Sequence, residues 1–222
     1  SAKYAAAAAE KFQRVVTLPA QRGSIRDRRG EHLALDEQIF VLYTGRVHLH
    51  EMVTVRRQLA KVLKKPVEEL RSSLSPADTL KTYHQHIASK LSGALGMSEG
   101  DLLTALHSPK AETIIVPEMP SDEATKVREM LESENIIGVY LRPDVKRLYP
   151  ARNRLTLLLG DVNPEHKGTF GVERLSDGIL QGTYGHQTIE RDRAGRELPL
   201  YRGESVLPRD GADTFLTIDM NL

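Results

Sequence analysis

The chain of 222 residues contains no cysteine and no tryptophan, and no apolar run approaches the roughly 20 residues that a membrane-spanning helix needs. The absence of cysteine excludes disulfides, thiolate catalysis and cysteine-ligated zinc. Aromatic residues make up only 5% of the chain, which predicts a modest core of aliphatic side chains without a large, deep pocket. The net charge of +1 creates no overall field that would favour nucleic acid or a membrane surface.

Motifs of nucleophilic catalysis and phosphate binding are also missing. The patterns S-x-x-K, K-T-G and G-x-S-x-G do not occur, and the glycines near residue 182 lack the Lys-Ser/Thr ending of a P-loop. Two histidine pairs, His48 with His50 and His84 with His86, have the spacing that places both rings on one face of a strand. Without a supporting H-E-x-x-H pattern we expect packing or solvated histidines, and no metal or cofactor.

A glycine-rich stretch at residues 168–185 contains a short polar segment, residues 172–180, which we expect to form one helix between two glycine turns. Glu173 and Asp177 would then share one face of that helix. Acid-base catalysis needs two carboxyl groups in contrasting environments, and this polar surrounding does not suggest them. We therefore expect the two carboxylates to cap backbone groups or to pair with arginine.

Two segments have the chemistry of β-hairpin turns. In residues 21–35, Asp27 and Gly30 occupy the first and last positions of a four-residue turn, with Ile25 and Leu33 on the arms. The run D-R-A-G-R-E-L at residues 192–198 repeats the D-R-R-G-E-H-L of residues 27–33. We expect both hairpins to belong to one sheet, and the alternation near Phe215 predicts a further strand at residues 215–218.

Residues 50–107 follow a helical pattern instead. Leucines repeat with spacings of 4, 7 and 4 in two copies that lie 32 residues apart: Leu59, Leu63, Leu70 and Leu74, then Leu91, Leu95, Leu102 and Leu106. Breaks near Pro66 and Ser98 divide each copy, with Ser98 and Asp101 forming a capping box, so we expect two helical hairpins. A strand at residues 113–116, a helix that Ser121 caps and a strand from Ile136 should follow.

The N-terminal region combines a helix-forming, alanine-rich stretch at residues 1–14 with an excess of basic residues. Residues 1–30 contain seven basic side chains against two acidic ones. This excess could face a partner or anionic lipid, or it could be a solvated surface. Each helical hairpin also has the length of a helix-turn-helix, and the first carries basic residues at Lys61, Lys64, Lys65 and Arg71, whereas the second is not comparably basic. The balanced net charge argues against DNA binding.

Four segments, taken in order, resemble class B penicillin-binding proteins. R-G-S-I-R-D-R-R-G-E-H-L-A at residues 22–34 resembles the signature that begins the extracytoplasmic part of that family. R-L-Y-P at residues 147–150, the glycine-rich stretch from Gly168, and D-G-A-D-T-F-L-T-I-D at residues 210–219 are similar to later family segments. Arg152 and Leu157 depart from the second of these patterns, which usually has Gly and His there.

The resemblance implies an α+β fold: an elongated pedestal of β-hairpins and mixed sheet with an inserted helical head subdomain. It divides the chain into residues 1–48 (first hairpin), 49–140 (head) and 141–222 (return of the pedestal). The matching residues would have structural or coupling roles, and none would be catalytic. They are Arg22, Gly23, Asp27, Arg28, Gly30, Arg147, Pro150, Gly171, Glu173, Asp177, Gly182 and Gly185. Because Arg22, Arg147 and Glu173 all lie in family motifs, we expect Glu173 to pair with one of the two arginines.

In function, the resemblance implies the non-catalytic pedestal, or dimerisation domain, of a serine D,D-transpeptidase that binds penicillin and cross-links peptidoglycan. Implied partners are the transpeptidase domain of the same chain, a SEDS-family glycosyltransferase, cell-wall scaffold proteins and a second copy of the chain, but no nucleic acid. The implied location is the extracytoplasmic face of the bacterial cytoplasmic membrane, with an anchor upstream of Ser1. The alternatives are a stand-alone interaction module and a DNA-binding protein with helix-turn-helix-like hairpins.

Overall fold

The computed structural model describes residues 13–150, 152–191 and 197–219. The chain forms two compact units, each assembled from separate segments. The helical unit is built around Phe40–Arg142, and the motif unit consists of Arg14–Ile39, Pro143–Ile189 and Leu200–Leu222. Both helices and sheets are present, as the α+β prediction required. No helix among the described residues is long and apolar enough to cross a membrane.

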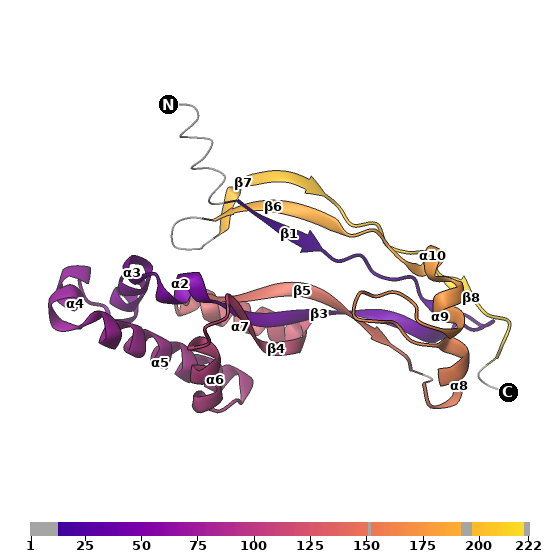
Figure 1. Cartoon of the computed structure of the whole chain (residues 1–222), viewed down its shortest axis with the longest axis horizontal. Helices are drawn as coiled ribbons and strands as arrows, with labels where there is room; N and C mark the ends of the chain where they lie inside the picture. The colour runs from indigo at the N-terminus through magenta and orange to yellow at the C-terminus, as the bar shows by residue number, and fades with distance from the viewer. Residues whose placement is uncertain (1–12, 151, 192–196, 220–222) are drawn as a thin grey trace. The chain divides into compact units, whose positions relative to one another are not determined.

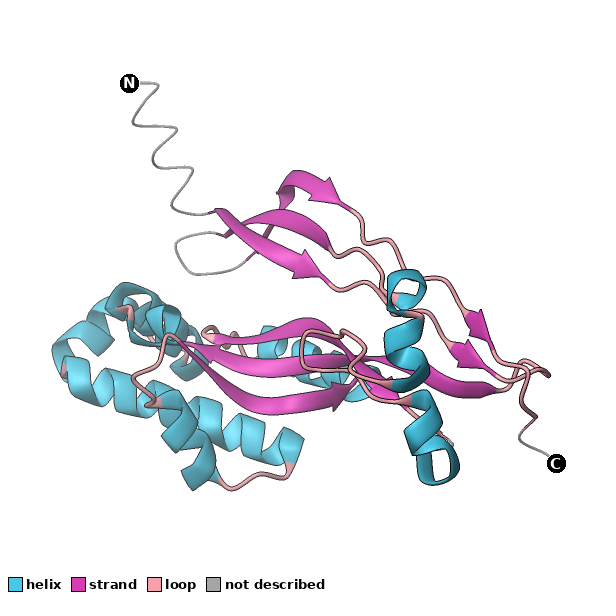
Figure 2. Ribbon diagram, turned by 45° about the vertical axis from the view of Figure 1, so that its right-hand side comes forward, coloured by secondary structure: helices cyan, strands magenta, loops and turns pink. Residues whose placement is uncertain are grey.

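The larger sheet has five strands in the order β4-β3-β2-β8, with β5 also paired to β3. Its strands are β2 (Ile25–Arg26), β3 (His32–Gly45), β4 (Glu112–Pro120), β5 (Val139–Leu148) and β8 (Thr214–Phe215). Figure 2 draws the strands of the chain in magenta. Strand β2 runs antiparallel to β3, with Ile25 opposite Ala34, and parallel to β8. The first predicted hairpin is therefore confirmed, and its short arm also pairs with a segment 189 residues further along the chain.

A second sheet of three strands has the order β1-β6-β7, formed by β1 (Gln13–Leu18), β6 (Gly185–Arg191) and β7 (Glu197–Val206). The prediction that the two hairpins share one sheet is wrong, since β2-β3 and β6-β7 lie in different sheets. The physical reason is that the free edges have different partners: β6 pairs with β1, whereas β2 pairs with β8. The second turn, residues 192–196, lies outside the described residues, as does most of the predicted N-terminal helix.

The helical unit contains six helices among the described residues, which Figure 1 labels along the chain. They are α2 (Arg46–His50), α3 (Met52–Leu63), α4 (Val67–Ser73), α5 (Pro76–Leu95), α6 (Glu99–Leu106) and α7 (Ser121–Ser133). The predicted breaks are present: Lys64 and Gly96 end α3 and α5 in the left-handed conformation. Ser98 caps α6 as predicted, its Oγ accepting from the Asp101 N–H at 3.2 Å. Ser121, predicted at the cap, is instead the first residue of α7, and Pro120 occupies the cap position.

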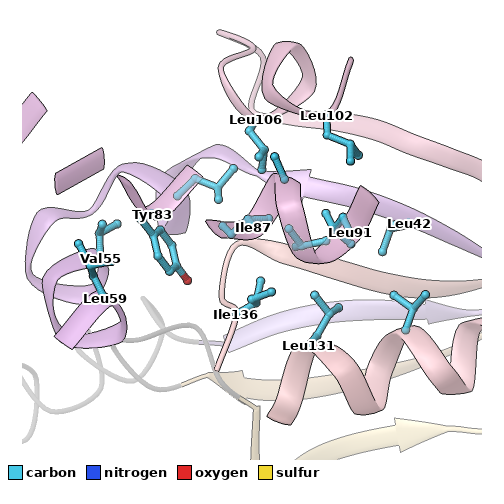
Figure 3. Packing of buried hydrophobic residues seen from close by; sticks show 14 of the residues in the cluster. Leu42, Val55, Leu59, Tyr83, Ile87, Leu91, Leu102, Leu106, Leu131 and Ile136 are labelled. Atoms are coloured by element: carbon cyan, nitrogen blue, oxygen red, sulfur yellow. The ribbon is translucent and has the colours of Figure 1, made fainter. Parts of the chain in front are cut away.

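The leucine repeats supply the core of this unit, where Leu59, Leu91 and Leu102 are fully buried (Figure 3). Spacings of four and seven residues bring these side chains to one face of each helix, so the helices pack against one another and against the sheet. Tyr83 of α5 lies inside this core, 1% exposed. Its hydroxyl accepts from the Ile137 N–H at 2.9 Å and donates to the Ile137 carbonyl at 3.2 Å, which links α5 to the segment before β5.

Replacing Tyr83 by phenylalanine should lower the free energy of unfolding by about 2 kcal/mol, since both backbone groups of Ile137 would lose a buried partner. Chemical denaturation measures the loss. Replacing the half-buried Tyr140 by phenylalanine, where the hydroxyl contacts His48 at 2.6 Å, is the matched control and should have a smaller effect. Equal losses at the two positions would contradict the role given to the Ile137 contacts.

The motif unit has a smaller core, with Ile25, Leu33, Ala34, Leu159, Val172 and Leu180 as its buried residues. Its helices are α8 (Arg152–Leu159), α9 (Gly171–Leu175) and α10 (Asp177–Leu180), seen with β8 in Figure 1. The single helix predicted for residues 172–180 is wrong, because the chain forms two short helices there. Ser176, with φ −100° and ψ 12°, lies outside the regular helical region and separates them.

Candidate functional site

Glu173 of α9 is the centre of a buried ion cluster in the motif unit. Its Oε2 accepts from Arg22 Nε at 2.7 Å, and its Oε1 accepts from Arg147 Nε at 2.9 Å. The Glu173 side chain is 0% exposed, and both arginine side chains are 2% exposed. The expected pairing of Glu173 with Arg22 or Arg147 is confirmed for both arginines at once. A carboxylate with a guanidinium on each oxygen is held in one position and cannot reach a substrate.

Each arginine also binds other groups with its remaining N–H groups. Arg22 donates to the Asp177 carboxylate at 2.7 Å and to the Glu173 carbonyl at 2.8 Å. Arg147 donates to the Asp36 carboxylate at 3.0 Å and to the carbonyls of Arg22 and Gly23 at 3.2 and 2.9 Å. The two planar guanidinium groups therefore connect β3, β5, α9, α10 and the segment before β2, which is the geometric role that arginine suits best.

The cluster holds two cationic and three anionic side chains, so its formal charge is one negative unit. Burial would raise the pKa of Asp177, but hydrogen bonds from the Gly168 N–H and Arg22 outweigh it, and the pKa lies below its ordinary value. Burial, together with Glu173 and Asp161, raises the pKa of the neighbouring Tyr149 hydroxyl, which keeps its proton. The arrangement favours fixed charges over proton transfer.

Asp36 is the functional residue of the cluster that the sequence prediction missed. Its side chain is 1% exposed; one oxygen accepts from Arg147, and the other accepts from the Arg22 N–H at 2.7 Å. The sequence did contain a sign of this role, because Asp36 is an acidic residue only two positions after the first motif. Asp177, predicted to cap or pair with arginine, does both, since it also accepts from the Gly168 N–H at 2.8 Å.

The first motif also builds the hairpin turn between β2 and β3. The buried carboxylate of Asp27 accepts from the Arg29 and Glu31 N–H groups at 2.8 and 2.9 Å. Gly30 has a φ of +89°, a conformation that glycine adopts without a steric cost. The predicted turn chemistry of Asp27 and Gly30 is confirmed.

Replacing Asp27 by alanine should reduce the free energy of unfolding by about 2 kcal/mol, because two N–H groups of the turn would lose a charged acceptor. Replacing it by asparagine should cost less, because one acceptor oxygen remains. Urea denaturation of the two variants tests the order. The assignment fails if asparagine and alanine destabilise the chain equally.

The basic side chains of the same hairpin are neutralised by residues near the C-terminal end of the described chain. Arg26 binds Asp213 at 2.8 Å, and Arg28 and Arg29 lie 3.6 and 2.8 Å from the buried Asp219 carboxylate. The basic excess of the N-terminal sequence is thus balanced in the fold at these three positions. The basic excess therefore supports a basic partner surface less strongly than the sequence suggested.

The remaining motif residues lie at turns and close backbone approaches. Gly171, with a φ of +62°, begins α9, and Gly185 begins β6. Gly182 lies against Ala20 and the Arg209 carbonyl, and Pro150 is an exposed residue of the turn that follows β5. Leu157, which stands where the resembling family usually has histidine, is 88% exposed on α8.

The histidine pairs lie on helices α2 and α5, which corrects the expectation of a shared strand face. Residues two apart on a helix point to different sides, and His48 contacts Tyr140 while His50 lies against His84. His86 faces Glu134 at 3.8 Å. Within the described ranges, no group of three or more histidine, aspartate or glutamate side chains is arranged to hold a metal ion.

Comparison with known proteins places this geometry in a family. The model of the Penicillin-binding Protein dimerisation domain matches residues 17–214. The probable peptidoglycan D,D-transpeptidase PenA of Neisseria meningitidis is 24% identical over 212 residues, which cover 94% of this chain and 30% of PenA. The chain spans less than a third of the length of the first curated relatives that it matches.

Two solved structures share the fold. A peptidoglycan synthetase from Bifidobacterium adolescentis is 25% identical, with a TM-score of 0.59 over 94% of this chain and 37% of that chain. PBP2 in its complex with MreC from Helicobacter pylori is 20% identical, with a TM-score of 0.55 over 94% of this chain and 36% of that chain. Because the family model covers most of the sequence, including all three motifs that meet at Glu173, the chain belongs to the penicillin-binding protein dimerisation domain family.

Proposed function

We propose that this chain is the non-catalytic pedestal of a peptidoglycan D,D-transpeptidase, which positions the catalytic domain and couples it to a SEDS-type glycan polymerase and to scaffold proteins. The observation that carries the proposal is the Arg22–Glu173–Arg147 cluster. It joins three motifs separated by up to 151 residues through buried, charge-assisted bonds. Such a cluster holds a rigid support in one conformation, which is the mechanical requirement for positioning a second domain.

The residues of the chain are consistent with a non-catalytic, structural role. The nucleophile patterns of penicillin-binding enzymes are absent from the 222 residues, and the buried carboxylates of the motif unit are engaged by arginine or backbone N–H groups. The serine that reacts with penicillin would then belong to the remainder of the longer protein, as the length of the relatives suggests. The family also accounts for the features that had suggested the two alternatives, a stand-alone interaction module and a DNA-binding protein. We therefore prefer the pedestal.

Exposed apolar side chains on the motif unit support contact with another domain. Leu157 and Leu175 are 88% exposed and Ile179 is 58% exposed, on α8, α9 and α10. Exposed apolar side chains that lie on adjoining elements are typical of surfaces that a partner covers, and α9 contacts both α8 and α10. We propose the transpeptidase domain of the same chain as the first partner of this surface. The Helicobacter pylori PBP2–MreC complex supports scaffold proteins as further partners.

The location follows from the same proposal. A pedestal of a peptidoglycan cross-linking enzyme works on the extracytoplasmic face of the cytoplasmic membrane, where the polymer is made. A second copy of the chain is a further candidate partner, and sedimentation of the chain over a range of concentrations measures whether it dimerises.

A labelled penicillin tests the division between support and enzyme. The 222-residue chain should form no covalent adduct, whereas the full-length parent should be labelled at a serine outside these residues. Covalent labelling of the 222-residue chain would refute the non-catalytic role.

Competition tests the coupling. An excess of the 222-residue chain should lower the activity of a SEDS polymerase that is reconstituted with the full-length parent, because the chain would occupy the partner without supplying the catalytic domain. The same excess of a variant with Leu157, Leu175 and Ile179 replaced by serine should inhibit equally, if that surface faces the transpeptidase domain. Absence of inhibition by the unmodified chain would remove the coupling role and leave the pedestal role intact.

A further inference from the structure

Three histidines from separate helices meet inside the helical unit. His84 of α5 is 1% exposed, and its ring centroid lies 5.3 Å from that of His50, the last residue of α2. His107 lies at the C-terminal cap of α6, and its ring centroid is 5.0 Å from that of His84. His84 thus contacts both neighbouring helices through imidazole rings.

The hydrogen bonds of His84 define its protonation. Its Nε2 lies 3.2 Å from the carbonyl oxygen of Leu49. A carbonyl can only accept, so Nε2 holds the proton and Nδ1 has a bare lone pair. Nδ1 is buried and has no hydrogen-bond partner among the described residues. A second proton on this ring would therefore be placed in the core without an acceptor.

Among the described residues, no carboxylate acts on the pKa of His84. Helices α2 and α3 contain no aspartate or glutamate. The acidic residues of α5 and α6 are engaged elsewhere or exposed: Asp78 pairs with Ser75, Asp101 pairs with Ser98, and Glu99 is exposed. At the adjoining caps, Glu51 caps α3, and Glu134 binds Lys90 and faces His86. The basic residues of the four helices are Arg46, Arg56, Arg57, Lys61, Lys81 and Lys90. The titratable groups that act on His84 are His107 and His50, and both can only add positive charge.

We propose that His50, His84 and His107 form an acid-sensitive latch, which holds α2, α5 and α6 together while the imidazoles are neutral and releases them when the cluster gains protons. The His50 and His84 rings pack edge to face, and the His84 and His107 rings are tilted by 57° to each other. Protonated rings at about 5 Å would repel one another, most strongly at His84, which is shielded from water. The protons would thus act on the packing of the helical unit and leave the arginine cluster of the motif unit in place.

The direction of the pH dependence follows from the contacts. Burial has the largest effect on the pKa of His84 and lowers it. The hydrogen bond to Leu49 raises the pKa, and His107 and His50 lower it further, so that it falls to about 4. In the unfolded chain the same group titrates near its ordinary value of about 6.5. The unfolded state therefore binds the proton more readily, so the stabilisation is complete above about pH 6.5 and is lost as the pH falls towards 4.

Hydrogen exchange of the 222-residue chain between pH 7 and pH 4, with rates corrected for intrinsic exchange, tests the latch. Amides of α5 and α6 should lose roughly 100-fold in protection in the wild type, as the linkage of these two pKa values predicts. In His84→Gln, whose amide can still donate to the Leu49 carbonyl, the loss should shrink to a few-fold. Equal losses in the two proteins would overturn the proposal.

A second measurement does not depend on the folding of the variant. Proton NMR titration of the wild type should show His84 neutral down to about pH 4 or until the helical unit opens. In His107→Gln, which alters an exposed ring, His84 should titrate at a higher pH, because one repelling charge is removed. An ordinary titration of His84 near pH 6.5 in the folded wild type would refute the latch.

Discussion

Replacing Glu173 by alanine is expected to lower the free energy of unfolding by about 3 to 5 kcal/mol, the largest loss expected for a single side chain of the motif unit. The change would leave the Arg22 and Arg147 guanidinium groups buried, each 2% exposed, without the carboxylate that lies between them. Arg22 would keep Asp177 and Arg147 would keep Asp36, but each buried guanidinium would lose one charged partner, which costs far more than an exposed ion pair contributes.

Chemical denaturation with two controls separates charge from volume. Glu173→Gln keeps the size of the side chain and one acceptor, so its loss should be smaller than that of alanine. Glu165→Ala removes an exposed glutamate of the same unit and should change the free energy by no more than about 0.5 kcal/mol. If Glu173→Ala were as harmless as Glu165→Ala, the ion cluster would have no part in holding the three motifs together.

Replacing Gly23 by alanine should be at least as damaging, with a loss above about 3 kcal/mol or failure to fold. A Cβ atom at this position would lie 2.0 Å from the carbonyl oxygen of Ala212 and 2.4 Å from its carbonyl carbon. Hydrogen bonds hold both sides of this contact, and the Ala212 N–H donates to the Ile179 carbonyl at 3.0 Å. The Gly23 N–H donates to the Leu180 carbonyl at 2.8 Å, and the Gly23 carbonyl accepts from Arg147 at 2.9 Å.

Gly178→Ala is the matched control for Gly23→Ala. A Cβ atom on Gly178, within α10, would meet nothing within 4 Å, so this substitution should be neutral or should stabilise the chain by up to about 1 kcal/mol. Circular dichroism and thermal unfolding of the two variants measure the contrast. Two variants of equal stability would show that the backbone at Gly23 can move away from Ala212, contrary to the close approach described above.

Local structure was predictable where the cause lies within a few residues. Asp27 accepts from N–H groups two and four positions ahead, and Ser98 from the N–H three positions ahead, so the turn and the cap depend only on their own segments. The helical hairpins follow from leucine spacing in the same way. Even here some boundaries were wrong, since α7 has Pro120 at its cap position where Ser121 was predicted, and Ser176 divided one predicted helix into two.

The candidate site was predictable in part, through motifs rather than geometry. Family motifs indicated that Glu173 would meet Arg22 or Arg147, but only the fold shows that it binds both arginines, one on each oxygen. Asp36 lies outside the motifs, and its burial depends on the neighbours of β3. The histidine cluster was hidden as well, because His50, His84 and His107 come together only through helix packing.

The amino-acid sequence by itself determined the turns, most helix boundaries, the leucine faces and the motifs that mark this family. Tertiary structure alone decided that the two hairpins enter different sheets, that Asp36 completes the ion cluster, and that an imidazole is buried without an acceptor. The reason is the range of the interactions. Turn and cap chemistry acts within about four residues, whereas the choice of strand partner and the desolvation of a charge depend on segments far apart in the sequence.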